Sequence, residues 1–343
     1  MSVRECVLAE FEKNRGVYLS GEELASRLNV SRTAVWKAVK SLQEEGYEIE
    51  GINNRGYCLS GESDILSVPA ILKYLHREGI QFRICKTLSS TNDLGKSLAA
   101  EGEPEGLVIL AEEQSRGRGR FGRSFYSSAG SGLYMSILLR PRCSAQEALS
   151  ITAAAAAAVS EAVEKVSGVK AEIKWVNDVY CRGRKICGIL TEAGFDLEGG
   201  GLEYAVLGIG VNVKLPENGI PDELEGKIGY VFEDETAPPD VRNHLAAVII
   251  DRFFSYYDHL EEKTFMETYR QRSFLDGKTV KILSTGAAAV QKREAAGSEA
   301  DLYETAVVLG IDEECRLLVR LADGGIKALC AGEVTLHQEG NKK

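Results

Sequence analysis

A short basic segment, EEQSRGRGRFGR at residues 112–123, carries the clearest chemical signal in this sequence. Between Gln114 and Ser124 it holds four arginines, three glycines and no acid, although the chain as a whole has a formal net charge of -10. Arginine binds carboxylate and phosphate oxygens through a planar fork of donors, and glycine lets the backbone approach a ligand closely or adopt positive φ. The segment is therefore predicted to be an anion-binding loop.

The sequence on both sides of this loop indicates that the loop is ordered. Apolar runs typical of strands, bounded by turn residues, precede it at 106–111 and follow it at 132–139. The alternative is a disordered arginine- and glycine-rich segment that binds nucleic acid. That alternative fits poorly, because such segments do not lie between two core strands.

Four further segments combine polar or charged side chains with glycine or a turn. They read SSTN at 89–92, KWVND at 174–178, GRKICGIL at 183–190 and GIGVN at 208–212. Taken singly, an SSTN segment is more often a helix cap, and a lysine beside an arginine such as Lys185 is more often a solvated surface residue. Two fragments that end like a P-loop, at 95–97 and 277–279, lack the first glycine of that motif, so any ATP site is of another kind.

Together with the arginine loop, and in the same order along the chain, these segments resemble the bifunctional biotin–protein ligases of the biotin operon repressor type. The resemblance implies an α+β protein in three parts. These are an N-terminal winged helix-turn-helix DNA-binding domain (1–62), a central α+β catalytic domain of the biotin ligase and class II aminoacyl-tRNA synthetase-like type (63–273), and a C-terminal SH3-like β-barrel (274–338).

The resemblance also implies a two-step reaction. Biotin and ATP, with Mg²⁺ on the substrate phosphates, would form biotinyl-5′-AMP, and the biotin would pass to a lysine of the biotin carboxyl carrier protein of acetyl-CoA carboxylase. The residues that match catalytic positions of the family are Lys185, Arg118, Arg120 and Asp178. Asp178 would either ligate Mg²⁺ or assist deprotonation of the attacking lysine.

The same resemblance supplies a set of biotin- and adenylate-binding residues. The set is Ser90, Thr91, Asn92, Gln114, Gly117, Arg118, Gly119, Arg120, Lys185, Gly188 and Asn212. Hydroxyl and amide side chains suit the ureido ring of biotin, which is polar and neutral. A homodimer is expected when the adenylate is bound.

Two other functions stay open from the sequence. A lipoate–protein ligase is disfavoured by the arginine loop with its two glycines, and a biotin-sensing regulator without useful ligase activity is disfavoured by the presence of Lys185 and Arg118. The chain also departs from the family pattern, because Val176 replaces the usual proline, Phe125 replaces the usual tryptophan, and residues 284–304 lengthen a C-terminal connection. The two apolar replacements should spare the chemistry, although Phe125 lacks an indole N–H.

The first sixty residues independently predict a helix-turn-helix. A capping-box pattern at 20–23 opens a helix through Leu28, and a turn follows at 29–30. Ser31 then caps a second helix, which runs to Glu45 and is closed by the glycine that follows. Two short helices joined by a tight turn are typical of this DNA-binding motif.

The second helix gathers basic side chains on one face. From Ser26 to Leu42 there are four basic residues and no acid, the pattern of a surface that contacts phosphates and bases. Strand-like runs at 47–50 and 57–59 flank a basic turn and predict a wing. The predicted DNA-contacting residues are Arg32, Thr33, Trp36, Lys37, Lys40 and Arg55. Operator DNA of biotin genes is the partner that the resemblance implies, and a helical hairpin for packing or dimerisation is the alternative.

Other patterns predict the remaining core. A buried helix is expected over 146–166, around the alanine run 153–158, and it should pack closely on a sheet. Short strands separated by turns follow Phe274 and fit a small SH3-like barrel. These strands are expected at 277–283, 305–311, 316–321 and 326–330.

Composition excludes several classes of protein. Apolar residues make up 44% and charged residues 27%, as in globular proteins. No apolar run is long enough to span a bilayer and the N-terminus has no signal-peptide core, so a cytoplasmic protein without membrane association is expected. The eight cysteines form no C-x-x-C pair and the four histidines lack metal-ligand spacing. We therefore expect free thiols and no protein-bound metal.

Overall fold

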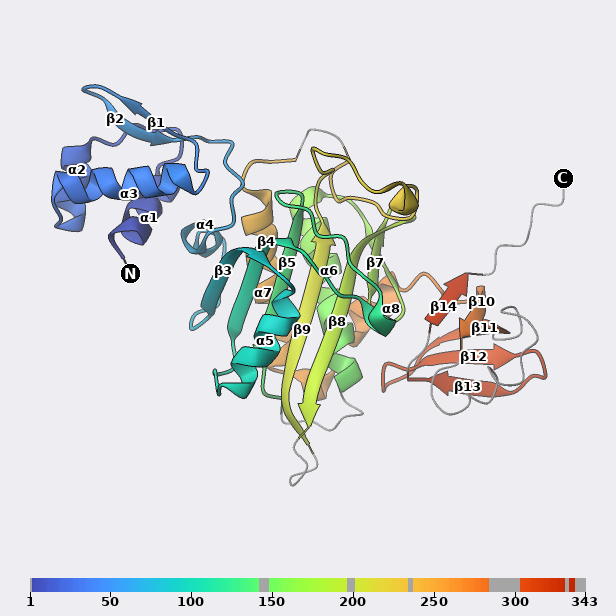
Figure 1. The fold of residues 1–343 in the computed structure, drawn as a ribbon. Helices are drawn as coiled ribbons and strands as arrows, with labels where there is room; N and C mark the ends of the chain where they lie inside the picture. Colours follow the sequence, from blue (N-terminus) through green and yellow to red (C-terminus); the bar gives the residue numbers. More distant parts are fainter. Residues whose placement is uncertain are drawn as a thin grey trace.

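The structure is a computed structural model that describes residues 2–141, 148–195, 201–233, 237–283, 303–330 and 333–336. The described strands form three sheets, with two, seven and five strands. Figure 1 shows the two-stranded sheet in an N-terminal helical unit at one end of the molecule, the seven-stranded sheet in the middle and the five-stranded sheet at the other end. None of the helices in these ranges has the length and apolar character needed to cross a membrane.

Three helices build the N-terminal unit, namely α1 (Val3–Lys13), α2 (Gly21–Leu28) and α3 (Arg32–Glu44). The predicted caps of the second and third helix are present, because the Ser20 and Ser31 hydroxyls accept hydrogen bonds from backbone N–H groups of the first turn. The helix-turn-helix prediction is therefore confirmed.

Two details of this unit differ from the sequence prediction. The capping box at 20–23 is half formed, because the Glu23 carboxylate accepts a hydrogen bond from Arg27 at 2.5 Å. Helix α1 was not predicted, although Ser2 and Glu5 form a complete capping box at its start. The buried side chain of Phe11 places α1 in the same core as the predicted helices.

A hairpin of β1 (Ile49–Ile52) and β2 (Gly56–Leu59) follows α3 and forms the predicted wing. Its first strand begins later than expected, because Tyr47 is buried in the helical core instead of pairing in the hairpin. Gly46, which closes α3, has a φ of 105°, as its predicted role as a left-handed terminator requires.

The central sheet is almost entirely antiparallel. Its strands are, in spatial order, β3 (Gln81–Leu88), β4 (Leu107–Gln114), β5 (Gly132–Leu139), β9 (Leu202–Asn212), β8 (Arg184–Phe195), β7 (Asp178–Cys181) and β6 (Ala171–Lys174). Only β3 and β4 pair in parallel. The strands predicted on either side of the arginine loop are thus neighbours in the sheet, and β7 and β8 form an antiparallel hairpin.

Helices cover both faces of this sheet (Figure 1). Helix α5 (Thr91–Ala100) packs on β4, β5 and β9, whereas α6 (Ala148–Ser167) and α7 (Val241–Tyr257) pack together behind the sheet. The alanines at 153–158 are fully buried, which confirms the predicted helix, although residues 146 and 147 lie outside the described ranges. Short methyl side chains allow this close approach of helix and sheet.

The C-terminal sheet contains one more strand than predicted. Its antiparallel strands are, in spatial order, β13 (Ile326–Leu329), β12 (Leu317–Leu321), β11 (Tyr303–Ile311), β10 (Thr279–Leu283) and β14 (Glu333–Leu336). The last of them was not predicted, and residues 284–302 of the long connection lie outside the described part of the chain. Trp175 joins this sheet to the centre, because its indole N–H donates to the Cys315 carbonyl at 2.9 Å.

Short helical segments complete the chain. They are α4 (Val68–Leu72), α8 (Met266–Arg272) and the 3₁₀ turns η1 (Arg120–Gly122), η2 (Asp222–Leu224) and η3 (Leu260–Glu262). Helix α4 contacts both α1 and α7, so it lies between the N-terminal unit and the central layers. In the segment 61–63 before it, the Ser63 carbonyl accepts a hydrogen bond from Arg15. The connection between the two units is therefore fixed.

Candidate functional site

The arginine loop leaves β4 at Gln114 and returns to β5 after being tied to the sheet and to itself. Backbone N–H groups of Ser115 and Arg116 donate to carbonyls at the end of β3 and just beyond it, each at 2.9 Å. The Phe125 N–H donates to the Gly117 carbonyl at 2.8 Å, which folds the loop back on itself. The prediction of an ordered loop is confirmed.

The glycines of the loop do not all act as the sequence suggested. The loop glycines were expected to allow close backbone approach or positive φ, and the residues with positive φ in the loop are Phe121 and Gly122, with φ of 58° and 73°. Gly117 is required for another reason, since a Cβ atom there would lie 2.3 Å from the Phe125 carbonyl oxygen. Residue 117 therefore has to be glycine because two backbone segments approach closely there, and not because its φ is positive.

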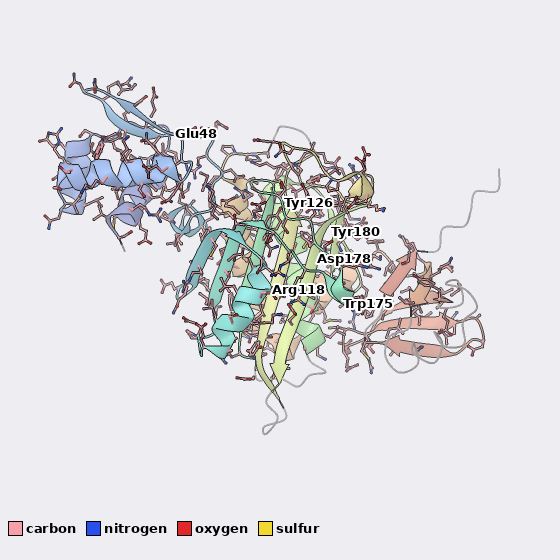
Figure 2. The ribbon with its side chains drawn as sticks, in the orientation of Figure 1. Glu48, Arg118, Tyr126, Trp175, Asp178 and Tyr180 are labelled. Atoms are coloured by element: carbon pink, nitrogen blue, oxygen red, sulfur yellow. The ribbon has the colours of Figure 1, made fainter. Side chains whose placement is uncertain are left out.

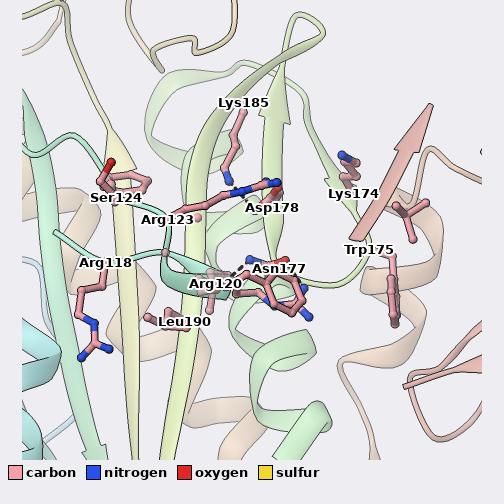
Figure 3. Close-up of a pocket in the computed structure, with 16 residues that line it drawn as sticks. Arg118, Arg120, Arg123, Ser124, Lys174, Trp175, Asn177, Asp178, Lys185 and Leu190 are labelled. Carbon is pink, nitrogen blue, oxygen red and sulfur yellow. Dashed lines mark hydrogen bonds and ion pairs between the residues drawn. The ribbon is translucent and has the colours of Figure 1, made fainter. Parts of the chain in front are cut away.

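A pocket lies between the loop and the β7–β8 hairpin (Figure 3). In it, the Lys185 ammonium lies 2.7 Å from Asp178 Oδ1, and Arg120 Nη1 donates to Asn177 Oδ1 at 3.0 Å. Asp178 is the only acidic side chain among the described residues that line this pocket. The site is thus rich in cations and suited to an anionic ligand.

The sequence-predicted residues Arg118, Arg120, Asp178 and Lys185 all line this arginine pocket. Figure 2 shows Arg118, Asp178 and Trp175 grouped over the central sheet, with Glu48 distant in the N-terminal unit. Trp175 is 4% exposed and forms part of the pocket wall. The loop and the hairpin, which are far apart in the sequence, therefore form one site.

A second, polar pocket adjoins the first and contains the predicted biotin-binding residues of the SSTN segment. The Gln114 side-chain carbonyl accepts hydrogen bonds from the backbone N–H and the hydroxyl of Thr91, at 2.8 and 3.1 Å. The Gln114 amide donates to Ser127 Oγ at 2.9 Å. Ser90 occupies the N-cap position of α5, but its side chain makes no cap hydrogen bond. The SSTN segment thus lies at the start of a helix, as the helix-cap interpretation predicted, but its serine does not cap that helix through its side chain.

Asn92 anchors the floor of the polar pocket. Its Oδ1 accepts from the fully buried Ser136 hydroxyl at 2.6 Å, and its Nδ2 donates to Glu192 Oε2 at 3.0 Å. Gly208 lies against it, because a Cβ atom at that position would lie 2.2 Å from Asn92 Oδ1. The GIGVN segment is therefore needed for close packing under the pocket.

Phe125 lies where the arginine pocket meets the polar pocket and lines both. Its ring lies over two glycines, since a Cβ atom would come within 2.7 Å of the ring at Gly210 and within 3.3 Å at Gly188. Arg118 and Leu190 are also shared by the two pockets. The pockets thus form one continuous site, polar at one end and cationic at the other.

Arg118 takes part in a four-membered charge cluster at the edge of this site. Asp93 Oδ1 lies 2.7 Å from Arg118 and 3.1 Å from Lys96, and Glu192 Oε1 lies 2.9 Å from Lys96. Burial alone would raise the pKa of Glu192, but hydrogen bonds from Asn92 and Lys96 outweigh burial and lower it. The pKa of Asp93 is lowered in the same way, against burial, by Lys96 and Arg118.

Some predicted residues lie outside the two pockets. The Asn212 side chain donates to the Gly229 carbonyl at 3.2 Å at the end of β9, and neither Asn212 nor Gly117 is among the residues that line either pocket. Arg116 is exposed, so only three of the four loop arginines line the site. No sequence signal identified Asp93, Lys96, Ser136 or Glu192, because nothing in their local pattern shows that they meet Asn92 and Arg118.

The predicted DNA-contacting residues are all exposed on the N-terminal unit. On α3, Val35 and Leu42 are buried, and the predicted set Arg32, Thr33, Trp36, Lys37 and Lys40 is exposed. Trp36 is 49% exposed, and the Lys40 ammonium lies 5.7 Å from its ring centre. Arg55 at the tip of the wing lies over the Tyr18 ring. Arg27 is engaged by Glu10 and Glu23, so it does not add to this surface.

No group of three or more His, Cys, Asp or Glu side chains that could hold a metal ion occurs within the described ranges. Seven cysteines in these ranges are free thiols, and Cys143 lies outside them.

Comparison with known proteins agrees with this geometry. A sequence model of the Biotin/lipoate A/B protein ligase family matches residues 84–212, and one described as an HTH domain matches residues 4–58. The fold and the site thus define a protein ligase of the biotin and lipoate class that carries a helix-turn-helix unit.

Curated relatives narrow the assignment. Bifunctional ligase/repressor BirA of Bacillus subtilis (strain 168) is 36% identical over 263 residues, which cover 75% of this chain and 80% of that protein. Bifunctional ligase/repressor BirA of Escherichia coli (strain K12) is 27% identical over 327 residues, 94% of each chain. The chain belongs to the family of bifunctional biotin ligase/repressors.

A solved structure supports the central fold. Biotin protein ligase from Aquifex aeolicus in complex with biotin and ATP is 25% identical and aligns with 75% of this chain and 98% of that chain, with a TM-score of 0.58. That structure is a complex with biotin and ATP, the two small molecules that the family resemblance implied.

Proposed function

We propose that this protein activates biotin with ATP to biotinyl-5′-AMP and transfers the biotin to a lysine of the biotin carboxyl carrier protein of acetyl-CoA carboxylase. The observation that carries the proposal is the continuity of the polar and cationic pockets through Arg118, Phe125, Gly188 and Leu190. A single ligand with a polar neutral ring and an acidic tail would fit across them, with its carboxylate among the cations.

In this proposal the cations of the arginine pocket stabilise the negative charge that develops when the carboxylate attacks the α-phosphate. Lys185 would contact both the carboxylate and the phosphate, with Arg118 and Arg120 binding the remaining oxygens. Asp178 orients Lys185 through their 2.7 Å ion pair. Because it is the only carboxylate among the described lining residues, it is also the candidate to bind substrate-borne Mg²⁺ or to accept a proton from the acceptor lysine.

The two roles of Asp178 can be separated by one substitution. Asp178→Asn would slow adenylate formation if the carboxylate binds Mg²⁺ or is needed to orient Lys185, and would slow only the transfer to carrier protein if its role is that of a base. Measuring pyrophosphate exchange and transfer on the same preparation distinguishes these roles, since the two steps are read independently.

The polar pocket would bind the ureido ring. Thr91, Asn92 and Gln114 already form a hydrogen-bonded network, so a ligand would meet side chains held in fixed positions. Met135, Leu190 and Ile209 supply apolar surface for the rest of biotin. The remaining proposed ligand-binding positions are Ser90, Gly117, Gly119, Gly188 and Asn212.

The N-terminal unit would bind operator DNA of biotin genes through the exposed face of α3 and the tip of the wing. We assign residues 1–62 to this DNA-binding domain, 63–273 to the catalytic domain and 274–338 to an SH3-like barrel formed around the five-stranded sheet. A homodimer formed when adenylate is bound would present two winged helices to two half-sites, which makes biotin a co-repressor.

The experiment that tests the ligase proposal is ATP–pyrophosphate exchange with biotin and lipoate measured in parallel. We expect exchange that depends on biotin and is weak with lipoate, because the polar pocket provides donors and acceptors for a ureido ring. Exchange that prefers lipoate would reject the substrate assignment, and no exchange with either acid would reject the ligase activity.

A further inference from the structure

Arg118 is already bound to carboxylates of the protein itself. Its Nη1 lies 2.7 Å from Asp93 Oδ1 and 3.5 Å from Glu192 Oε1. Lys96 contacts the same two oxygen atoms, at 3.1 and 2.9 Å. Two cations therefore share two carboxylates, and the cluster is neutral as a whole.

This cluster continues directly into the polar pocket. Asp93 lies in the first turn of α5, next to Asn92, and the second oxygen of Glu192 accepts from Asn92 Nδ2 at 3.0 Å. Figure 3 shows the Arg118 guanidinium directed away from the Lys185–Asp178 pair, although Arg118 lines both pockets. The Arg118 guanidinium, which should bind the carboxylate of the ligand, is thus turned toward carboxylates of the protein itself.

We propose that Asp93 and Glu192 form a carboxylate clamp on Arg118, which the carboxylate of an incoming ligand has to displace. The inference rests on the proposed function and adds how the affinity of that site is set. A ligand carboxylate and the Asp93 carboxylate offer arginine the same kind of contact, so binding exchanges one pair for another. When Arg118 leaves, Lys96 still contacts both acids, and the cluster keeps one net negative charge.

The clamp makes biotin affinity depend on residues that do not touch biotin. Removing the negative charge of Asp93 or Glu192 should release Arg118 and raise the affinity of the site for biotin. Exposed arginine–carboxylate pairs are weak, and Arg118 and Asp93 have side chains that are 45% and 37% exposed. The gain should therefore be about two- to fivefold in affinity.

The test compares full-length wild-type protein with Asp93→Asn. We expect the KM for biotin in pyrophosphate exchange to fall about two- to fivefold while kcat changes by less than about twofold. The dissociation constant for biotin alone, measured by titration calorimetry, should fall to the same extent. A substitution that only loosened the fold would not lower both constants.

Asp258→Asn is a matched control, because Asp258 pairs with Arg77 at 2.5 Å on the surface with side chains 44% and 34% exposed. It should leave the biotin KM unchanged. Glu192→Gln should shift KM in the same direction as Asp93→Asn, and thermal melting of each variant verifies that it is folded.

An unchanged biotin KM and dissociation constant in Asp93→Asn would overturn the clamp. A higher KM would also overturn it, since the acids would then be positioning Arg118 for the ligand. Loss of the proposed function is distinguishable from either result: it would appear as absence of exchange in the wild-type protein, whereas calorimetry still compares biotin binding between wild type and variant.

Discussion

Lys185 provides the positive charge nearest to the proposed reaction, and Asp178 holds it in the arginine pocket at 2.7 Å. We expect Lys185→Ala to slow biotin-dependent pyrophosphate exchange by about a hundred- to a thousandfold, because a cation that stabilises charge in the transition state is lost. The fold should survive, since the side chain is half-buried at a site and does not belong to the core.

Lys170→Ala is the control for this substitution, because the Lys170 side chain is 77% exposed and pairs only with the neighbouring Glu172 among its described contacts. It should leave exchange unchanged. Near-normal exchange in Lys185→Ala would reject the assignment of Lys185.

At the scale of residues, the sequence predicted many of the residues that line the site but not their partners. The match to family motifs identified Lys185, Arg118 and Arg120, and all three line one pocket. The contacts of Arg118 with Asp93 and Glu192 join segments that are distant in the sequence. Such contacts depend on the pairing of strands, which no local pattern encodes.

At the scale of elements, the arginine loop is the part most directly tied to the ligand. Arg120 lies in η1 and donates to Asn177 at 3.0 Å, so it connects the loop to the segment before β7. We expect Arg120→Gly to retain part of the adenylation activity but to release the adenylate, because the loop loses contacts that hold it over the product. Released adenylate would label lysines of an unrelated protein added to the reaction.

The exposed Arg116 of the same loop supplies the control, and Arg116→Gly should not increase labelling of the bystander protein. If Arg120→Gly forms adenylate normally and labels no bystander, the loop does not retain the product.

A buried charge network joins α1 to α7 across the connection between the N-terminal unit and the central sheet. Arg15 lies 2.6 Å from Glu12 and 3.0 Å from Asp240, and Lys73 contacts the same two acids. Glu12 and Asp240 are each 3% exposed. We expect Arg15→Met to destabilise the protein by about 3–5 kcal/mol, because two buried acids would then share one lysine.

Urea unfolding followed by fluorescence measures this loss. Arg4→Met is a matched control, since Arg4 pairs with Glu45 at 2.6 Å on the surface, and it should cost less than about 1 kcal/mol. Equal stability of the two variants would show that the network does not hold the units together.

The elements with strong local signals were predicted well. Caps and turns marked α2 and α3, apolar runs marked β4 and β5, and the C-terminal strands were recognised up to β13. Helix α1 was not predicted although its capping box is complete. The helix-turn-helix pattern involves only α2 and α3, so it does not indicate a preceding helix. The order of the central sheet was not predictable either, since β5 pairs with β9 across most of the catalytic region.

At the scale of the whole molecule, one chain combines a ligase site with a DNA-binding surface. We expect salt-sensitive binding to operator DNA, weakened by Arg32→Ala or Lys37→Ala, because both side chains are exposed on α3. If either contact is to a phosphate, the slope of log affinity against log salt should fall by roughly one unit. Lys86→Ala, an exposed lysine on β3, should have no effect on gel-shift titrations.

The same titrations with biotin and ATP test the proposed co-repressor role. Adenylate should tighten operator binding by no more than it strengthens dimerisation, which analytical ultracentrifugation measures independently. Binding that is equally tight with and without biotin and ATP would leave the DNA-binding surface in place but reject the co-repressor role.

The most direct test of the proposed ligase is the mass of the acceptor protein. Purified carrier domain is incubated with the full-length protein, ATP and biotin, and its intact mass is measured. We expect the addition of one biotinyl group at a single lysine, which is lost when ATP is omitted or when Lys185→Ala replaces the wild type. An unmodified carrier domain, or one that takes up lipoyl groups in preference to biotinyl groups, would contradict the assignment.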